Sequence, residues 1–266
     1  MIDFHNHILP NVDDGSKSLE MSLNMLREAE LQGITDVINT VHYQHPKVED
    51  RDISFERINQ EIENLQRNAL ENNINVKIHN GAEVFYLPNL LELIDNPQTT
   101  IGNGKYMLIE FPTIQFPPNY ENTLFELSME GVIPIIAHPE RYADIQNDII
   151  ELASLVQRGC LVQVDAGSII GMFGPNAQKL SHQILKTGLC HIIGSDSHND
   201  STRNICLKDA ISICTNHLGV DVNDMVKDNP QKILNGEIIE SEVDLDYLIN
   251  KKSTIWMQLK SALFNV

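Results

Sequence analysis

Two histidines near the start of the chain are the first side chains whose spacing could support chemistry. His5 and His7 follow a short apolar segment that looks like the end of a buried strand. Residues i and i+2 of an extended chain point the same way, so both imidazoles can reach one metal ion. The turn Asp13-Asp14-Gly15 could then bring carboxylates back over them. Taken alone, the motif also fits a strand end with two surface histidines.

Histidines and carboxylates recur wherever the chain leaves another apolar, β-branched segment. These residues are His42 after 34–41, Glu83 after 74–79, Glu110 near the end of 106–111, His138 after 132–137, and Asp196 and His198 after 189–194. The carboxyl ends of parallel strands in a barrel meet on one face. Any one of these side chains could be a structural hydrogen-bonding or ion-pair partner. Their recurrence after successive strands predicts a shared metal centre.

The types of these side chains restrict the metal. Imidazole and carboxylate without thiolate suit manganese, iron, zinc or magnesium better than a structural zinc site. The groups are too many for one ion, because a catalytic zinc takes about three protein ligands. Two or three ions that share bridging carboxylates therefore fit better. Such clusters produce a hydroxide nucleophile near neutral pH and hold phosphoryl oxygens.

Two arginines stand close to the predicted ligands. Arg141 ends the segment His138-Pro-Glu-Arg141, and Arg203 follows His198 by five positions. The guanidinium group binds phosphate oxygens in a fork. The alternative is that both arginines form ordinary ion pairs on the surface or between helices. Since the chain is acidic, two arginines beside the predicted cluster favour a phosphate ester as substrate.

Composition limits the class of protein. The chain has 266 residues, 42% of them hydrophobic, and a formal net charge of −18. A hydrophobic fraction of 42% is enough to build a sizeable core. The negative net charge argues against a protein that coats nucleic acid, which would normally carry a basic face. The four cysteines form no C-x-x-C pair, and none has an arginine six positions later, so cysteine-phosphatase chemistry lacks support. No secretion signal or apolar run near 18 residues is present, and we expect a cytoplasmic protein.

Strand-like and helix-like segments alternate along the chain, which predicts an α/β fold with parallel pairing. Helices are expected from Ser16 or Ser18 to Gly33 and after Ser54, and near residues 87–94, 122–129, 145–158, 176–186, 202–218 and 230–234. An open doubly wound sheet and a closed barrel both suit this rhythm. The absence of a G-x-G-x-x-G or Walker loop weakens the open nucleotide-binding sheet.

Several motifs resemble those of the PHP (polymerase and histidinol phosphatase) superfamily. More closely, the chain resembles the metal-dependent protein tyrosine phosphatases of bacterial capsule and exopolysaccharide operons. The matching stretches are Met1–Pro10 with Asp13-Asp14-Gly15, Gly81-Ala-Glu83, Leu108-Ile-Glu110-Phe-Pro112, Ile136–Tyr142, Gly167-Ser168 with Gly171-x-Phe-Gly174, and Gly194-Ser-Asp196-Ser-His198-Asn. H-x-H alone occurs in many barrels, whereas H-P-E-R with G-S-D-x-H-N is far more specific.

The resemblance implies a single PHP-type distorted (β/α)7 TIM-like barrel over residues 1–238, with three ions, usually manganese. By position, His5, His7, Glu83 and Asp196 would hold the first ion, Glu83, Glu110 and His138 the second, and Asp14, His42 and His198 the third. Relatives often have a proline before the histidine at His42, and His45 follows closely, so His45 is a second candidate there; we favour His42.

The resemblance also names roles and a substrate. Arg141 and Arg203 would bind the substrate phosphate, and with His138 and Asp196 they make up the predicted catalytic residues. The implied substrate is the phosphorylated, tyrosine-rich tail of a membrane-associated bacterial tyrosine kinase, so contact with the membrane would be indirect.

Other readings remain open. They are a small-molecule PHP phosphatase such as a histidinol phosphatase, an amidohydrolase or TatD-type hydrolase, and an inactive scaffold that binds the kinase. The tail, residues 239–266, is expected to carry a short amphipathic helix within 251–264. That helix would pack on its own barrel, on another subunit of a homo-oligomer, or on the kinase or membrane surface.

Overall fold

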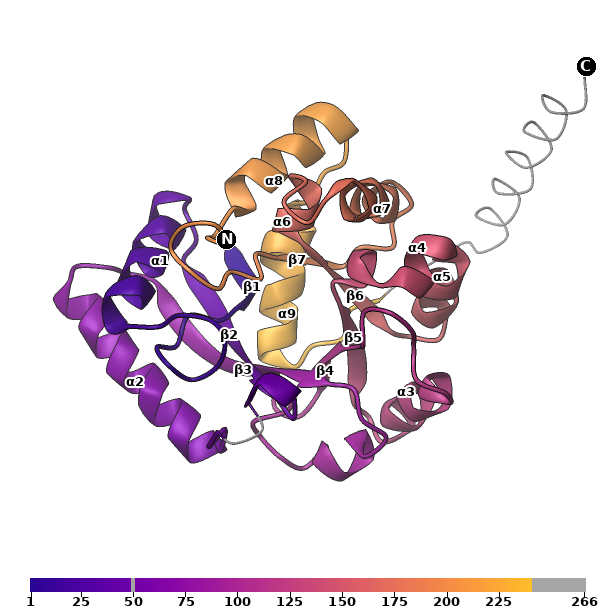
Figure 1. Cartoon of the computed structure of the whole chain (residues 1–266), viewed down its shortest axis with the longest axis horizontal. Coiled ribbons are helices and arrows are strands. Elements are labelled where there is room, and N and C mark those ends of the chain that lie inside the picture. The colour runs from indigo at the N-terminus through magenta and orange to yellow at the C-terminus, as the bar shows by residue number, and fades with distance from the viewer. Residues whose placement is uncertain (49–50, 241–266) are drawn as a thin grey trace, which may run out of the picture.

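Seven parallel strands form one curved sheet in the computed structural model, which describes residues 1–48 and 51–240. The strands pair in chain order, each with the next (Figure 1). Their bounds are β1 Ile2–Asn6, β2 Asp36–Tyr43, β3 Lys77–Phe85, β4 Tyr106–Glu110, β5 Ile133–Ala137, β6 Leu161–Asp165 and β7 Ile192–Gly194. Parallel neighbours need long crossover connections, and the helices outside the sheet supply them.

The sheet closes where the chain leaves its last strand and meets the first. The backbone N–H of Asp196 donates to His5 O at 2.7 Å, and that of His7 donates to Ser197 O at 2.9 Å. Asn6 and Ser197 also pair in parallel. The predicted single α/β barrel of seven parallel strands is therefore confirmed, and the open sheet is excluded.

The inward-facing residues of β4 are apolar at its start and polar at its end. Along β4, Tyr106, Leu108 and Glu110 share one face because alternate residues of a strand point the same way. Tyr106 and Leu108 lie in the apolar core inside the barrel, together with Ile233 of α9 (Asn229–Asn235). In Figure 1, α9 lies behind the ring of strands, so this helix covers the amino-terminal end of the barrel. Polar groups are left for the carboxyl end.

The remaining helices surround the sheet and bury a second, larger apolar core against its outer face. They are α1 Leu19–Leu31, α2 Phe55–Glu71, α3 Tyr120–Met129, α4 Ala143–Asn147, α5 Ile149–Gln157, α6 Ala166–Ile169, α7 Pro175–Lys186 and α8 Leu207–Ile213, with short turns η1 Pro46–Val48, η2 Leu90–Leu93, η3 Pro139–Arg141, η4 Cys214–Leu218 and η5 Asp224–Asp228. Ser18 caps α1, because its side chain accepts a hydrogen bond from Met21 N at 3.2 Å.

Two strands are displaced from their expected positions. The strand expected at 74–79 is β3, which starts and ends later and pairs with β2 over its length, from Lys77 opposite Asp36 to Val84 opposite Tyr43. Glu83 therefore lies within β3 and not after it. His42 likewise lies inside β2.

Two helices also differ from expectation. The helix expected at 145–158 is broken at Asp148, whose side chain accepts a hydrogen bond from Ile150 N at 3.0 Å and caps α5. The helix expected from 202 begins only at Leu207. The residues before it form a loop in which Asn199 Oδ1 accepts hydrogen bonds from the backbone N–H groups of Ser201 and Arg203.

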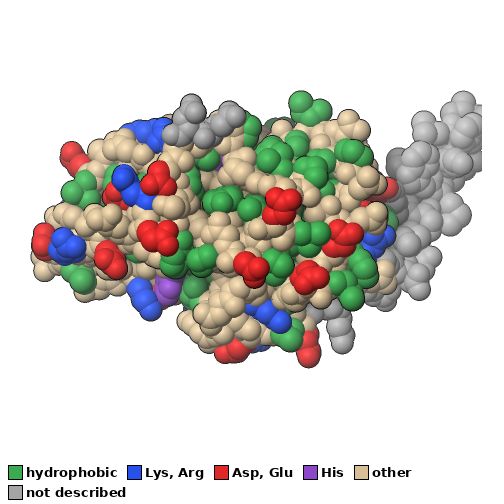
Figure 2. All heavy atoms as spheres, turned by 90° about the horizontal axis from the view of Figure 1, so that it is seen from below, with side chains coloured by type: hydrophobic (Ala, Val, Ile, Leu, Met, Phe, Trp, Pro, Cys, Tyr) green, Lys and Arg blue, Asp and Glu red, His purple; other side chains and the backbone are tan. Residues whose placement is uncertain are grey.

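The predicted tail falls almost wholly outside the described residues. Ile239 is buried in the inner core, but residues 241–266 are not described, so the amphipathic helix stays a prediction. Among the residues that are described, no helix has the length and apolarity needed to cross a membrane. On the face seen in Figure 2, acidic and apolar side chains are interspersed, and the basic side chains are scattered rather than gathered.

Candidate metal centre

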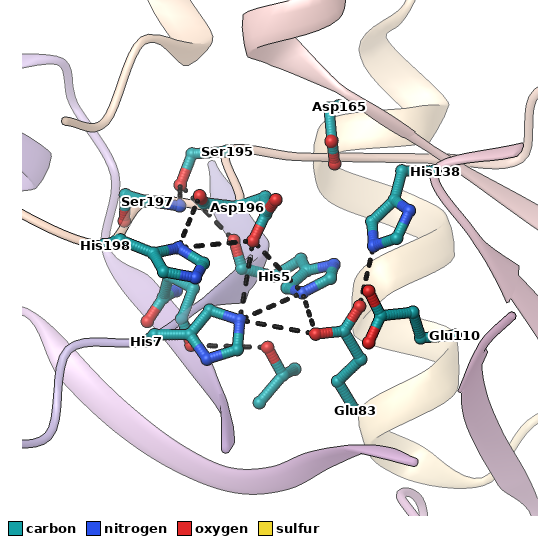
Figure 3. Close-up of polar contacts among 12 residues, drawn as sticks. His5, His7, Glu83, Glu110, His138, Asp165, Ser195, Asp196, Ser197 and His198 are labelled. Atoms are coloured by element: carbon teal, nitrogen blue, oxygen red, sulfur yellow. Dashed lines mark hydrogen bonds and ion pairs between the residues drawn. The ribbon is translucent and has the colours of Figure 1, made fainter. Parts of the chain in front are cut away.

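The nine residues predicted as metal ligands come together at the carboxyl ends of the strands. Figure 3 shows His5, His7, Glu83, Glu110, His138, Asp196 and His198 of this set. They form four overlapping groups whose ligand atoms lie within 4.8 Å of one another: His7, Asp14, His42 and His198; His5, His7 and Asp196; His5, Glu83 and His138; and His42, Glu83 and Glu110. All are buried except Asp14, which is partly exposed. Their roles as ligands remain predictions, but the sequence identified the set that the fold assembles.

His5 and His7 stand at the middle of the cluster. Their Nε2 atoms are 3.4 Å apart. Glu83 Oε2 lies 3.3 and 3.4 Å from the Nε2 atoms of His5 and His7. Asp196 Oδ1 lies 3.6 and 3.4 Å from the same two atoms. Two imidazoles and two carboxylates thus direct ligand atoms at one small volume.

Glu83 extends the cluster towards β4 and β5. Its Oε1 lies 2.7 Å from His138 Nε2, and its Oε2 lies 3.1 Å from His42 Nδ1. Glu110 Oε2 is 3.8 Å from the same His42 nitrogen. The two oxygens of Glu83 thus face histidines of different groups, so Glu83 belongs to more than one of them.

A third group lies on the other side of His7. Asp14 Oδ1 is 3.2 Å from His42 Nε2 and 3.2 Å from His198 Nε2. His45, the other candidate for this position, is outside the group: its ring stacks against His42 at 4.6 Å between centroids, and its Nε2 lies 3.6 Å from Glu110. The geometry therefore favours His42.

Two further residues orient the central histidines. Asp13 Oδ2 lies 2.7 Å from His7 Nδ1, and Gln163 Oε1 lies 3.0 Å from His5 Nδ1. Partners of this kind fix the ring and its tautomer so that the other nitrogen faces the metal. The sequence had indicated that the turn at residues 13–15 could bring the carboxylate of Asp13 back over these histidines. Gln163 was missed because only the assembled barrel brings side chains of β6 and β1 together inside it.

Buried charges give the cluster an electrostatic preference. Burial disfavours the charged form of His5, but the carboxylates of Glu83 and Asp196 outweigh it and raise its pKa to about 9. Burial would raise the pKa of Glu83, yet His5 and His42 hold it well below its usual range. The carboxylates thus favour positive charge in this volume, which suits divalent cations.

The surroundings of His42 fit metal ligation better than hydrogen bonding. Neither ring nitrogen of His42 makes a hydrogen bond of acceptable angle, although carboxylate oxygens lie 3.1 and 3.2 Å away. His138 and Asp196 leave their strands with φ of 33° and 48°. This left-handed backbone is unfavourable for residues with a Cβ and is often found at functional sites.

Arg141 and Arg203 lie beside the cluster at its Asp196 end. Arg141 Nη1 donates to Asp165 Oδ2 at 2.9 Å and to Asp196 Oδ2 at 2.6 Å. Arg203 Nη2 donates to the same Asp196 oxygen at 2.6 Å. Both guanidinium groups lie over the ring of Phe173, at 5.0 and 5.4 Å from its centroid. The arginines are thus positioned together, and their side chains remain partly exposed.

The fold and the site define a parallel (β/α) barrel with histidines and carboxylates gathered on its carboxyl-end face, the arrangement of metal-dependent barrel hydrolases. The sequence pattern of the family described as "Capsular polysaccharide synthesis, CpsB/CapC" matches residues 1–235, and the chain belongs to this family.

Individual relatives agree with this assignment. The chain is 36% identical to CapC of Staphylococcus aureus over 210 residues, which are 78% of this chain and 81% of CapC. It is 30% identical to the tyrosine-protein phosphatase YwqE of Bacillus subtilis over 240 residues, 90% of this chain and 93% of YwqE.

Solved structures give the same result. One from a study of YwqE of Bacillus subtilis and CpsB of Streptococcus pneumoniae, described there as unique metal-dependent tyrosine phosphatases, superposes with a TM-score of 0.85 at 30% identity. The match covers 91% of this chain and 97% of that one. A phosphotriesterase homology protein from Escherichia coli shares only the fold, with a TM-score of 0.55 at 11% identity over 88% of this chain and 98% of that one.

Proposed function

We propose that this protein is a metal-dependent phosphatase that hydrolyses phosphotyrosine on proteins. The observation that carries the proposal is the position of Asp196. One of its oxygens faces His5 and His7, and the other accepts hydrogen bonds from Arg141 and Arg203. A phosphoryl group at this place would meet the cluster and both arginines. Membership of a family whose relatives are named tyrosine-protein phosphatases supports the same reaction.

The cluster would hold two or three divalent ions, with manganese favoured and iron, zinc or magnesium as alternatives. His5, His7, Glu83 and Asp196 would hold one ion, Glu83, Glu110 and His138 a second, and Asp14, His42 and His198 a third. When bound, such ions activate water as a nucleophile and neutralise phosphoryl oxygens. The chain's own histidines and carboxylates fix where that chemistry takes place.

Arg141 and Arg203 bind the phosphoryl oxygens and orient the ester bond. Each guanidinium offers paired N–H donors that fit phosphate oxygens. The leaving group is a tyrosine phenolate, whose conjugate acid has a pKa of about 10, so it departs with less assistance than a serine alkoxide would need. His138 and Asp196 act through the ions that they would ligate.

Thiolate catalysis lacks support. All four cysteines are buried and unbridged. Burial raises the pKa of Cys160 and of Cys206 to about 12, so both thiols stay protonated at neutral pH. Four reduced, buried cysteines also fit a cytoplasmic location. There, the phosphorylated tail of a membrane-associated tyrosine kinase is the proposed substrate.

The test compares two substrates on one preparation. Protein stripped of metal and resupplied with Mn²⁺ is assayed on a phosphotyrosine peptide and on histidinol phosphate. We expect a higher kcat/KM for the peptide, loss of activity in His138→Ala, and unchanged activity in the control His217→Ala, which alters an exposed histidine. A higher kcat/KM for histidinol phosphate would assign the protein to small-molecule metabolism instead.

A further inference from the structure

A cavity of about 900 Å³ opens beside the metal cluster and has no part in the chemistry described above. It lies between the η1–α2 region and the segment from the end of β3 to η2. Its apolar lining includes Tyr43, Phe55, Phe85, Leu87 and Leu93. Its size falls within the range of about 300–1,000 Å³ that is typical of ligand pockets.

The cavity and the cluster share a wall. His45 lines the cavity, stacks on His42 at 4.6 Å and lies 3.6 Å from Glu110. Phe85, two residues beyond Glu83 on β3, packs edge-on against the His45 ring at 4.8 Å. A ligand in the cavity would therefore lie next to a ligand on the cluster.

The two arginines and the cavity are on different sides of the cluster. Arg141 and Arg203 contact Asp196, whereas His45 contacts Glu110. If the phosphate of a substrate binds at the arginines, the rest of the substrate can extend over the cluster towards the cavity. In a polypeptide, the Cα atom of the residue next to the phosphotyrosine lies about 3.8 Å from that of the phosphotyrosine, so its side chain is the first to meet the cavity.

The residues that line the cavity determine which type of side chain next to the phosphotyrosine would bind there. Leu87 remains 40% exposed although it lines the cavity, and it is one of the large apolar side chains left open to water. Asp52, Glu56 and Arg51 also line the cavity, so its charged side chains carry two negative charges and one positive charge. An apolar side chain that covers Leu87 would gain from burial of both surfaces.

We propose that this cavity is a subsite for an apolar side chain next to the phosphotyrosine of a polypeptide substrate. The inference rests on the proposed phosphatase function and adds a sequence preference to it. Because full burial of a leucine side chain corresponds to about tenfold or more in an equilibrium constant, a leucine neighbour should raise kcat/KM by roughly tenfold over glycine.

The experiment uses the full chain loaded with Mn²⁺ and two peptides that differ only in leucine or glycine on both sides of the phosphotyrosine. We expect a kcat/KM ratio of about 10 for the wild type. In Leu87→Asp the ratio should fall towards 1, and in Leu87→Met it should be retained. Leu70→Asp is the matched control, because Leu70 is an exposed leucine of α2 that does not line the cavity.

Binding provides a second readout that needs no turnover. Peptides with a non-hydrolysable phosphonate in place of the phosphate are titrated by fluorescence anisotropy. The leucine peptide should bind more tightly than the glycine peptide in the wild type, in Leu87→Met and in Leu70→Asp, but not in Leu87→Asp. A wild-type ratio near 1, or the same ratio in Leu87→Asp as in the wild type, would overturn the subsite. Hydrolysis of histidinol phosphate with neither peptide cleaved would overturn the proposal that the protein acts on phosphotyrosine in proteins, and the subsite with it.

Discussion

Arg141 and Arg203 donate to the same oxygen of Asp196, each at 2.6 Å. The second oxygen of Asp196 faces His5 and His7. One carboxylate thereby links the side chains proposed to bind phosphate with those proposed to bind metal. This link fixes the position of the two arginines relative to the predicted metal cluster, since neither arginine can move far without losing a charged partner.

Replacement of Arg141 by lysine tests the paired contact. Arg141→Lys keeps the positive charge beside Asp165 and Asp196 but loses the fork. We expect kcat/KM on a phosphotyrosine peptide to fall by about 10²-fold, similar to the loss of one transition-state donor elsewhere. Arg158→Lys, at an exposed arginine paired with Glu121, is the control. An unchanged kcat/KM in Arg141→Lys at unchanged metal content would contradict the role.

Asp13 is predicted to act through His7. Asp13→Asn removes the carboxylate that lies 2.7 Å from His7 Nδ1, so the ring loses its fixed tautomer and orientation. Loss of such a partner typically lowers metal affinity by about 10- to 100-fold. Titration calorimetry of metal-free protein with Mn²⁺ measures this affinity.

The chain contains a matched control for Asp13. Asp36 and His79 form a pair with the same 2.7 Å separation, at the other end of β2 and β3. Asp36→Asn should leave the Mn²⁺ affinity at the wild-type value. Equal losses in both variants would mean that Asp13 supports the fold rather than the metal.

Phe173 is predicted to hold the two arginines in place. Its ring lies under both guanidinium groups, and a Cβ at Gly167 would approach it to 2.7 Å, so the glycine makes room for the ring. Cation–π contacts contribute about 0.5–2 kcal/mol, so Phe173→Leu should raise KM by roughly two- to thirtyfold, with Mn²⁺ affinity unchanged. Met172→Leu, at the exposed neighbour, is the control. An equal KM in Phe173→Leu and in the wild type would contradict the prediction that Phe173 holds the arginines in place.

His191 makes stability depend on pH. Burial lowers its pKa to about 4, while the backbone N–H of Val162 donates to its Nδ1 at 3.1 Å. The folded pKa is below the unfolded value of about 6.5, so the unfolded chain takes up the proton first as pH falls. Stability is therefore present at neutral pH and is lost between about pH 6.5 and pH 4.

Urea unfolding of metal-free protein at pH 7 and pH 5 measures this loss. The wild type should lose about 2 kcal/mol more than His191→Gln over this interval. His217→Gln, at an exposed histidine, should follow the wild type. If the free energy of unfolding fell by the same amount from pH 7 to pH 5 in the wild type and in His191→Gln, protonation of His191 would not be linked to stability.

The sequence was sufficient to predict the histidines and carboxylates that cluster in the fold, because each of them stands close to the end of an apolar segment. It could not reveal Gln163 or Asp165, since both lie inside β6 and meet their partners only when β5, β6 and β1 come together in the barrel. Phe173 was part of a family motif, but its contact with the arginines depends on the loop before α7. The break at Asp148 was missed because apolar periodicity continues through it, whereas its side chain starts a new helix.

The most direct test of the account is to measure bound metal and activity on the same samples. Protein treated with chelator and then titrated with Mn²⁺ is analysed by elemental mass spectrometry and assayed on a phosphotyrosine peptide at each step. We predict no activity without metal and full activity at two to three ions per chain, with a loss of bound ions in Glu83→Gln. Full activity in protein that holds less than about a tenth of an ion per chain would contradict a mechanism based on clustered metals.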